Sequence, residues 1–320
     1  YDGIVSDVKA ISEICHRYGV PLIVDEAHGA HFRYGDVFPV PALESGADVV
    51  IQSVHKTLPC FTQSALLHVK EGYADREKIE KYLQIYQSSS PSYLLMAGIE
   101  QGILWMEQDE GRERIKQFSD SLKKLRRSLK NMEHLKILDR EIVGTRDVCD
   151  LDISKIVIST RGTDIDGFQL DNRLRNEYHL EMEMCAEDYV TAITTVMDTE
   201  EGLCRLKEAL TAIDRDLKKS HSSPPVHPET WEARTVTPIC RAWNGSKEQI
   251  SLRESRGKIS AEFLYLYPPG IPIIAPGELI TEEIIETVFR YREEGLRVCG
   301  LRDRNTEKIS VLRGELEWEN

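Results

Sequence analysis

Two chemically reactive side chains each follow an apolar run near the start of the sequence. Asp25 follows residues 20–24, and Lys56 follows the run that begins at Val49. Runs of this kind are typical of buried strands, and ligands of open α/β sheets bind beyond the carboxyl ends of the strands. A lysine amine and a carboxylate at one rim suit pyridoxal phosphate. The amine forms a Schiff base with this cofactor, and the carboxylate keeps the ring nitrogen protonated.

Ser53 and His55 lie beside Lys56 and strengthen this interpretation, because both side chains can bind a phosphate group. Taken singly, each feature has an ordinary explanation: a lysine after a strand is usually solvated, and an aspartate there usually caps the next turn. The combination favours a cofactor site. His28 and His31 are three residues apart and form a weak metal-binding pattern. The sequence offers no third ligand, so we expect no metal.

Two longer segments carry a family resemblance. Residues 1–68, which include the strings VDEAHGAHF and SVHKT, and residues 255–278 resemble the Orn/Lys/Arg decarboxylase family of fold-type I pyridoxal phosphate enzymes. The resemblance implies an α/β fold. A partial fold-type I large domain with a mostly parallel sheet would be followed by a small α+β domain and a C-terminal α+β decarboxylase domain. The family's first portion would precede Tyr1, so we expect a fragment that lacks part of the cofactor site.

The resemblance also implies how single residues would hold the cofactor. Ala27 would pack against the ring, and His28 would lie near its phenolic oxygen. Ser53 and His55 would bind the phosphate. Ser90, in a Ser-Pro-x-Tyr segment, would reach across a dimer interface toward the phosphate of the neighbouring subunit. Without the resemblance, the serine-rich segment around Ser90 is most simply an N-cap for the following helix.

The expected reaction is the decarboxylation of lysine, arginine or ornithine to a di- or polyamine precursor. The predicted catalytic residues are Lys56, His55 and Asp25. Lys56 or His55 would return a proton to the carbon that loses its carboxylate, while Asp25 keeps the ring protonated. Glu262 and Glu278 are candidates to meet the cationic substrate, although a glutamate near a turn is more often simply exposed.

Two alternatives stay open at this point. Aminotransferases and other lyases of the same fold share the aspartate and the lysine, and only the Tyr-Pro-Pro-Gly module at residues 267–270 favours a decarboxylase. A non-catalytic fragment that keeps the fold but binds no cofactor is the alternative from another class. We expect the partners to be a small basic amino acid and further copies of the chain, as a homodimer or a higher homo-oligomer.

Composition bears on partners and on compartment. The formal net charge of -13 argues against a nucleic-acid partner, whose phosphates attract clustered lysine and arginine. The seven cysteines are scattered and show no paired metal spacing, which is typical of thiols in a reducing compartment. No apolar run reaches the length of about 18 residues that a membrane helix needs. We therefore expect a cytoplasmic protein that does not contact a membrane.

The elements that must position these residues follow from apolar periodicity. Residues 6–18 predict a helix that Gly19 ends, with an apolar face formed by Val8, Ile11, Cys15 and Tyr18. The next elements are expected to be strands at 20–24 and 48–54, forming a parallel pair, a further strand at 64–69 and a short helix at 42–45. The family resemblance implies that the strand at 64–69 returns antiparallel. Two helices should follow, one over 71–86 and one from the serine-rich segment to about Leu129.

The remaining sequence predicts smaller domains. The predicted elements are strands at 155–160, 192–196 and 259–267 and helices at 166–178, 199–218 and from Thr281 to about residue 294. A segment rich in serine and proline at 219–228 predicts a linker. The predicted domains are residues 1–130, 131–218 and 229–320.

Overall fold

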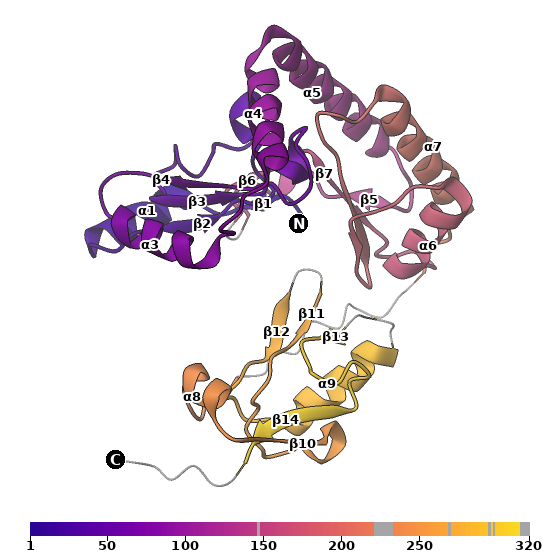
Figure 1. The fold of residues 1–320 in the computed structure, drawn as a ribbon. Coiled ribbons are helices and arrows are strands. Elements are labelled where there is room, and N and C mark those ends of the chain that lie inside the picture. Colours follow the sequence, from indigo (N-terminus) through magenta and orange to yellow (C-terminus); the bar gives the residue numbers. More distant parts are fainter. Residues whose placement is uncertain (146–147, 221–232, 268–269, 294–295, 297, 314–320) are drawn as a thin grey trace. The chain divides into compact units, whose positions relative to one another are not determined.

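The computed structural model describes residues 1–145, 148–220, 233–267, 270–293, 296 and 298–313. The chain forms two compact units, Tyr1–Ser223 and Pro224–Asn320 (Figure 1), and each is described here by itself. Most of the predicted linker 219–228 lies outside the described residues. The predicted division of the first unit at residue 130 stays a prediction.

The first sheet carries the candidate site. Its strand order is β2-β3-β4, where β2 is Ile23–Asp25, β3 is Val49–Gln52 and β4 is Leu66–Val69. As predicted, β2 and β3 are parallel, and β3 and β4 are antiparallel. The sheet is therefore mixed. In the described part of the chain, parallel pairing is limited to β2 and β3, whereas a mostly parallel sheet was expected.

Helix α1 (Val8–Arg17) begins at the N-cap Asp7, whose side chain accepts a hydrogen bond from the Ala10 amide at 2.9 Å. The predicted helix is confirmed, but the predicted apolar face is partly wrong. Ile11 is 40% exposed and Tyr18 is 79% exposed, whereas Ser12 is buried. The Ser12 hydroxyl donates to the carbonyls of Lys9 and Ser45. Periodicity could not reveal this burial, because it depends on a distant turn.

The segment that carries Lys56 also differs from the prediction. The strand expected over 48–54 ends at Gln52, and Val54–Thr57 form a short helix, α2. Ser53 occupies the N-cap position, so Lys56 extends from a helical turn and not from the strand itself. The short helix expected at 42–45 is a turn that includes Gly46 at φ +103°. A positive φ of this kind ends helical geometry.

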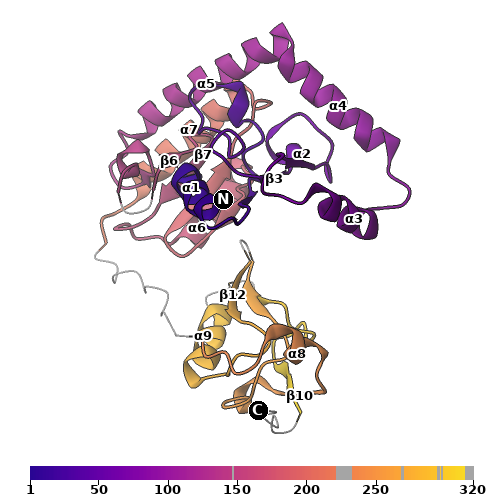
Figure 2. The same cartoon turned by 90° about the vertical axis from the view of Figure 1, so that its left-hand side faces the viewer.

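Three helices follow β4: α3 (Arg76–Tyr86), α4 (Tyr93–Glu107) and α5 (Asp109–Leu129). One continuous helix was predicted where α4 and α5 lie, but the backbone is extended at Gln108, and Figure 2 shows a sharp turn between the two helices. Gly111 permits this turn. A Cβ at that position would lie 2.1 Å from the Trp105 carbonyl oxygen.

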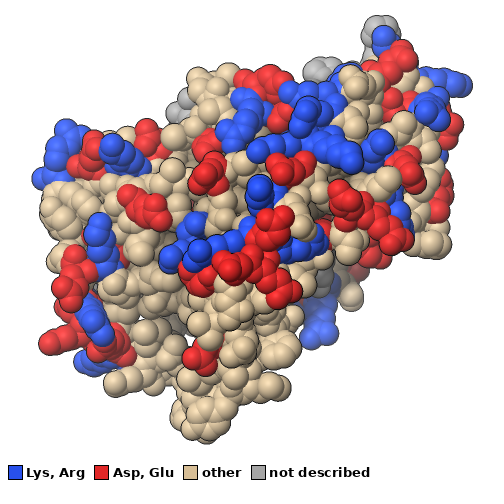
Figure 3. Space-filling model, turned by 90° about the horizontal axis from the view of Figure 1, so that it is seen from above, with Lys and Arg blue, Asp and Glu red and all other residues tan. Residues whose placement is uncertain are grey.

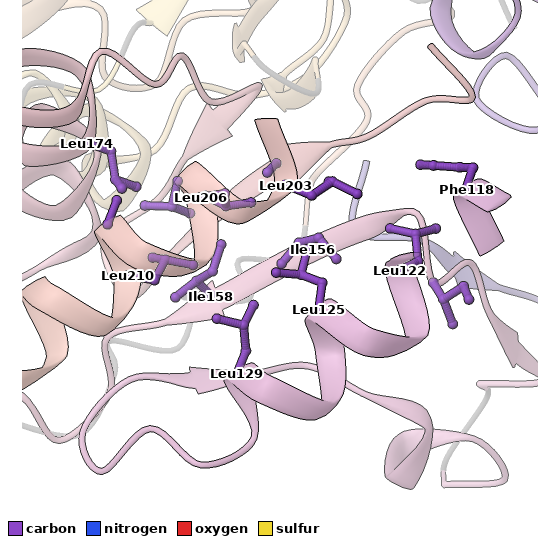
Figure 4. Close-up of a cluster of buried hydrophobic side chains, with 14 of the residues drawn as sticks. Phe118, Leu122, Leu125, Leu129, Ile156, Ile158, Leu174, Leu203, Leu206 and Leu210 are labelled. Carbon is purple, nitrogen blue, oxygen red and sulfur yellow. The ribbon is translucent and has the colours of Figure 1, made fainter. Parts of the chain in front are cut away.

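The second sheet is antiparallel, with the order β5-β7-β9-β8. Its strands are β5 (Lys136–Ile137), β7 (Lys155–Ser159), β8 (Met184–Cys185) and β9 (Tyr189–Ile193). Helices α5, α6 (Gly167–Tyr178) and α7 (Glu200–Asp216) bury leucines against Ile156 and Ile158 of β7 (Figure 4). The helices at 166–178 and 199–218 are confirmed to within two residues. The strand expected at 192–196 begins three residues earlier.

The start of the chain pairs with the segment that precedes β7. β1 (Ile4–Val5) and β6 (Asp150–Leu151) form a separate antiparallel two-stranded sheet. Gly3, at φ +81°, lies so close to this segment that a Cβ would be 2.8 Å from the Asp152 carbonyl oxygen. Three short 3-10 helices complete the described regular structure: Phe32–Tyr34, Arg140–Ile142 and Leu252–Glu254.

The second unit has its own apolar core between helix α9 (Glu282–Glu293) and two small sheets. The other elements are α8 (Ile239–Asn244), β10 (Lys247–Ser251), β11 (Leu264–Leu266), β12 (Ile271–Ile274), β13 (Val298–Cys299) and β14 (Lys308–Leu312). Thr281 caps α9 as predicted, because its hydroxyl accepts from the Ile284 amide. Pro268 and Pro269 of the predicted rigid turn lie outside the described residues.

The surface carries charges of both signs. Figure 3 shows acidic and basic side chains lying among one another over the face that it views. All seven cysteines are free. Within the described ranges, no helix is long and apolar enough to cross a bilayer.

Candidate functional site

Lys56 lies next to His28 beyond the carboxyl ends of β2 and β3. The Lys56 Nζ atom is 2.9 Å from the His28 Nε2 atom, and both side chains are partly buried. Lys56 comes from α2, directly after β3, and His28 comes from the turn that follows β2. The parallel pairing of the two strands thus brings a lysine and a histidine together at one rim of the sheet.

The His28 ring is neutral near pH 7. Burial lowers its pKa from 6.5 to about 3, and the nearby positive charge of Lys56 adds to the effect. A lysine ammonium can only donate, so the contact makes Nε2 the acceptor and assigns the ring proton to Nδ1. Nδ1 is buried and has no hydrogen-bond partner among the described residues. The Tyr1 ring packs against the His28 ring, with 4.7 Å between the two ring centroids.

Asp25 ends β2 on the opposite face of the sheet from α1. Side chains alternate along a strand, and the neighbouring Val24 packs in the apolar cluster around Val50. Asp25 is exposed, and its Oδ1 atom accepts a hydrogen bond from the Ala27 amide at 2.9 Å. This bond stabilises the turn that carries Ala27 and His28.

Glu26 fixes the same turn from the interior, and the sequence patterns did not identify it. Its Oε1 accepts from the Ala42 amide at 2.7 Å, and its Oε2 accepts from Gln52 Nε2 at 2.5 Å. The amide oxygen of Gln52 lies 3.0 Å from His68 Nε2, so these bonds connect the end of β2 to β3 and β4. Burial raises the pKa of the Glu26 carboxyl. A glutamate after a strand carries no local signal for such a role.

The loop around α2 contains polar groups that the chain itself leaves unsatisfied. The His55 ring bonds through Nδ1 to the Ser64 carbonyl at 2.8 Å, which fixes its orientation. Ser53 makes no side-chain bond to the amides of α2. The hydroxyls of Thr57 and Ser64 are buried and have no partner in the described part of the chain. Such an environment suits a polar ligand.

Three further predicted residues are described within their own units, Ser90 in the first and Glu262 and Glu278 in the second. Ser90 is exposed between α3 and α4, and the N-cap of α4 is Ser92. Glu262 accepts hydrogen bonds from two backbone amides of the second unit. Glu278 accepts one such bond, at 2.8 Å. The roles of Ser90, Glu262 and Glu278 in ligand binding stay predictions.

The described residues contain no group of three or more His, Cys, Asp or Glu side chains arranged to hold a metal ion. The two histidines of the weak metal pattern have separate partners, since His28 contacts Lys56 and His31 contacts Asp152. A cavity of about 530 Å³ lies in the second unit. It is lined by Ser251, Arg253, Phe289, Arg292, Glu293 and Glu307, none of which was predicted as a site residue.

A buried polar cluster lies behind His28 and was also missed. It consists of His31, Asp152, Ser154 and Lys155, each at most 2% exposed. Lys155 was predicted only as the first residue of a strand, where a lysine is usually solvated. Its burial depends on packing between segments far apart in the sequence, so no local pattern reveals it.

Together these features describe a mixed α/β protein in which a lysine amine and a neutral histidine meet beyond two parallel strands. Two family descriptions match this chain. "Orn/Lys/Arg decarboxylase, major domain" matches residues 1–176, and "Orn/Lys/Arg decarboxylase, C-terminal domain" matches residues 229–297. The chain belongs to the Orn/Lys/Arg decarboxylase family.

Several curated proteins are similar to the chain. An arginine decarboxylase of Bacillus subtilis (strain 168) is 33% identical over 98% of this chain and 64% of its own length. An arginine decarboxylase of Bacillus anthracis is 31% identical with the same coverage. The inducible lysine decarboxylase of Escherichia coli (strain K12) is 23% identical over 72% of this chain and 43% of its own length. The chain therefore spans less than two thirds of these relatives.

Solved structures share the fold. The constitutive lysine decarboxylase of E. coli superposes with a TM-score of 0.76 at 17% identity, covering 98% of this chain and 57% of the other. Lysine decarboxylase A from Pseudomonas aeruginosa gives a TM-score of 0.74 at 19% identity, covering 98% and 56%. At these identities the likeness extends to the α/β fold alone.

Proposed function

We propose that this chain forms the lysine-bearing part of a fold-type I, pyridoxal phosphate-dependent decarboxylase. Its proposed substrate is a basic amino acid, namely arginine, lysine or ornithine. The observation that carries the proposal is the 2.9 Å contact between Lys56 Nζ and His28 Nε2 in a chain of this family. The names of the similar proteins, arginine and lysine decarboxylase, support a cationic substrate.

The residues of the site fit such a cofactor. The unpaired Nδ1 of His28 and the unused hydroxyls around α2 are buried polar atoms that lack a partner among the described residues. The Ser53 hydroxyl makes no capping hydrogen bond to α2 and can therefore donate a hydrogen bond to a phosphate group. The residues proposed to hold the cofactor are Asp25, Ala27, His28, Ser53, His55 and Lys56, together with Ser90 from a second copy of the chain.

When bound, the cofactor supplies an aldehyde for amines and a ring that accepts the electron pair of the broken carbon–carboxylate bond. Asp25 would hold the proton of the ring nitrogen, because a carboxylate stabilises the protonated ring. His28 accepts a hydrogen bond from Lys56 and so orients the amine. Lys56, or His55 with its ring fixed by the Ser64 carbonyl, would return a proton to the substrate carbon.

A homodimer is the proposed minimal assembly. Helices α3 and α4 expose an unusual set of large apolar side chains: Tyr82, Ile85, Tyr86, Tyr93, Leu94, Met96 and Leu104. We infer that these side chains contribute to an interface, because exposed apolar patches mark interaction sites. The same two helices flank Ser90, which the proposal assigns to the site of the second copy.

Chemical trapping tests the proposal directly. The chain would be mixed with pyridoxal phosphate, reduced with borohydride and digested, and the modified lysine located by mass spectrometry. We expect the label on Lys56, and we expect Lys56→Ala to lose it while Lys70→Ala, at an exposed lysine after β4, keeps it. A label spread over surface lysines, or one that survives Lys56→Ala, would remove Lys56 from its role.

The substrate is tested separately, by release of labelled carbon dioxide from arginine, lysine and ornithine. Release from one of them, lost in Lys56→Ala, is the expected result. Transfer of the amino group to a keto acid without carbon dioxide release would favour an aminotransferase. If Lys56 is labelled but no amino acid is turned over, the result would favour a chain that binds the cofactor and needs additional polypeptide for catalysis.

A further inference from the structure

The cluster behind His28 is an ion pair that is almost wholly removed from water. Lys155 Nζ lies 2.7 Å from Asp152 Oδ2 and 3.1 Å from Ser154 Oγ. The second oxygen of Asp152 accepts from the Ser154 amide at 2.9 Å and lies 3.3 Å from His31 Nε2. The side chains of Lys155 and Asp152 are 1% and 2% exposed. This pair belongs to the strand region at the start of β7.

Lys155 also reaches the turn that forms the candidate site. Its Nζ is 3.5 Å from the carbonyl oxygen of His28, the residue whose ring meets Lys56. His31, at the other end of the same turn, contacts Asp152 and Ser154. The pair therefore touches both ends of the turn 28–31. Through β7 it connects this turn to the second sheet.

A pair of apolar side chains would join the turn 28–31 to the start of β7 without the free energy that is needed to remove two charges from water. Removing two charges from water carries a desolvation penalty that their attraction often fails to recover, and a buried ion pair is weak support for stability. The next three residues of β7, Ile156, Val157 and Ile158, are buried and apolar, so the strand already has a packing surface. A lysine at position 155 is therefore better explained by its contact with the turn 28–31, where its ammonium group approaches the His28 carbonyl oxygen.

We propose that Lys155, held by Asp152, is a positioning residue of the candidate site: it fixes the turn 28–31 so that the His28 ring meets the Lys56 amine. This inference rests on the proposed function of Lys56. Lys155 touches neither substrate nor cofactor in this proposal, and it acts through His28. The proposed consequence is that His28 stays neutral and keeps its Nε2 lone pair directed to Lys56.

The charges around His28 agree with this arrangement. Burial lowers the pKa of His28 most strongly, and the positive charges of Lys56 and Lys155 lower it further. Asp152 acts in the opposite direction. Since Asp152 sits between Lys155 and His31, neutralising Lys155 changes the field at His28 and also removes the contact to its carbonyl.

Titration of His28 by nuclear magnetic resonance tests the proposal without cofactor. Lys155→Met keeps the length of the side chain and removes the charge. We expect the pKa of His28 to rise by about one unit or more, the size of effect that one nearby charge produces. Lys123→Met, at a lysine on α5 with a 46% exposed side chain, is the matched control and should leave the titration unchanged.

Lys155→Met leaves Asp152 buried without its partner, so a second variant protects the test against misfolding. In Lys155→Met/Asp152→Asn both charges are removed together. Because Lys155 lowers the His28 pKa and Asp152 raises it by less, we expect the His28 pKa to rise by less than in Lys155→Met. The rate of borohydride trapping at Lys56 should fall at least about fivefold at pH 7 in either variant. A His28 titration that matches wild type in a folded variant would overturn the proposal and reduce the pair to a structural contact.

The two proposals fail in different ways. If Lys56 is never labelled by pyridoxal phosphate, the proposed function fails, while the His28 titration still reports whether Lys155 positions the turn. If Lys56 is labelled normally in wild type and in both Lys155 variants, the cofactor assignment stands and the positioning role of Lys155 is wrong.

Discussion

At the scale of single residues, the candidate site depends on a histidine that stays uncharged beside a lysine. A protonated His28 would have no lone pair for Lys56 and would repel its ammonium group. The turn that holds His28 is fixed from three directions, by Asp25, by Glu26 and by Lys155. As the pH falls, protonation of His28 should therefore break its contact with Lys56 and loosen this turn before more distant parts of the first unit unfold.

His28 also makes stability depend on pH. Its pKa is about 3 in the folded chain and 6.5 when unperturbed, so between these values the unfolded chain binds more protons. Stability therefore rises with pH across this window, is complete above about pH 6.5 and is lost on acidification. We expect His28→Gln to reduce the fall in melting temperature between pH 7 and pH 4, measured by circular dichroism.

A second histidine serves as the control for this measurement. His179 is exposed and has a left-handed backbone, φ +54°, which asparagine tolerates. His179→Asn should keep the acid sensitivity of wild type. His31 is also buried, and its burial lowers its pKa. The His28→Gln variant should therefore keep part of the acid sensitivity. An unchanged slope in His28→Gln would show that His28 is not the group responsible.

Only part of the site could be predicted at this scale. Asp25, His28, Ser53, His55 and Lys56 lie in strings that resemble a known family, so the sequence could propose them, and their roles in ligand binding stay predictions. The roles of Glu26, Asp152 and Lys155 were not identifiable from sequence, since their burial results from segments that meet only in the folded chain. Charged side chains are usually exposed, and sequence reasoning assigns each of them to solvent.

At the scale of elements, the close approach of α4 and α5 requires a residue without a side chain. A Cβ at Gly111 would overlap the Trp105 carbonyl oxygen and the backbone of Met106. Backbone cannot move aside as a flexible side chain can. We expect Gly111→Ala to lower the free energy of unfolding by about 1–3 kcal/mol, the usual cost of overpacking, in urea unfolding followed by circular dichroism.

Gly202 supplies a matched comparison within another helix. It lies in the first turn of α7, and the nearest atom to its Cβ would be the Thr199 hydroxyl at 3.5 Å, an ordinary contact. Gly202→Ala should be neutral or stabilise the chain by up to about 1 kcal/mol, because alanine favours helix. Equal effects at both glycines would contradict the steric explanation for Gly111.

The elements themselves were predictable where apolar patterns are long. Helices α1, α6 and α7 follow from periodicity and capping residues. The parallel pairing of β2 with β3 follows from the βαβ-like order of the elements, and the antiparallel direction of β4 was predicted from the family resemblance. The helical turn α2 and the break at Gln108 do not follow from any of these. Four residues are too few for a periodic signal, and the break is stabilised by contacts between two helices rather than by proline.

At the scale of the whole molecule, the proposed homodimer depends on the large apolar side chains that α3 and α4 expose. Leu94, in the first turn of α4, is 70% exposed. A charge buried in an apolar interface without a partner is strongly unfavourable. We expect Leu94→Asp to weaken self-association at least about tenfold, which corresponds to about 1.4 kcal/mol, in sedimentation equilibrium.

Ile239, at the start of α8 in the second unit, is 49% exposed and lies on neither α3 nor α4. Ile239→Asp is therefore the control and should leave the mass distribution unchanged. A wild-type chain that sediments as a monomer at all concentrations would end the proposal of a homodimer. A Leu94→Asp variant that remains dimeric would place the interface elsewhere.

The exposed apolar side chains on and beside β2 bear on how the chain behaves in concentrated solution. Among the described residues, β2 pairs with β3 on one side only, and Ile23 on this strand is 63% exposed, with Val20 just before it at 50%. Open strand edges with apolar side chains recruit other chains through backbone pairing. Concentrated solutions of this 320-residue chain by itself should therefore turn turbid with time. Ile23→Lys, which places a charge on the same strand, should keep them clear.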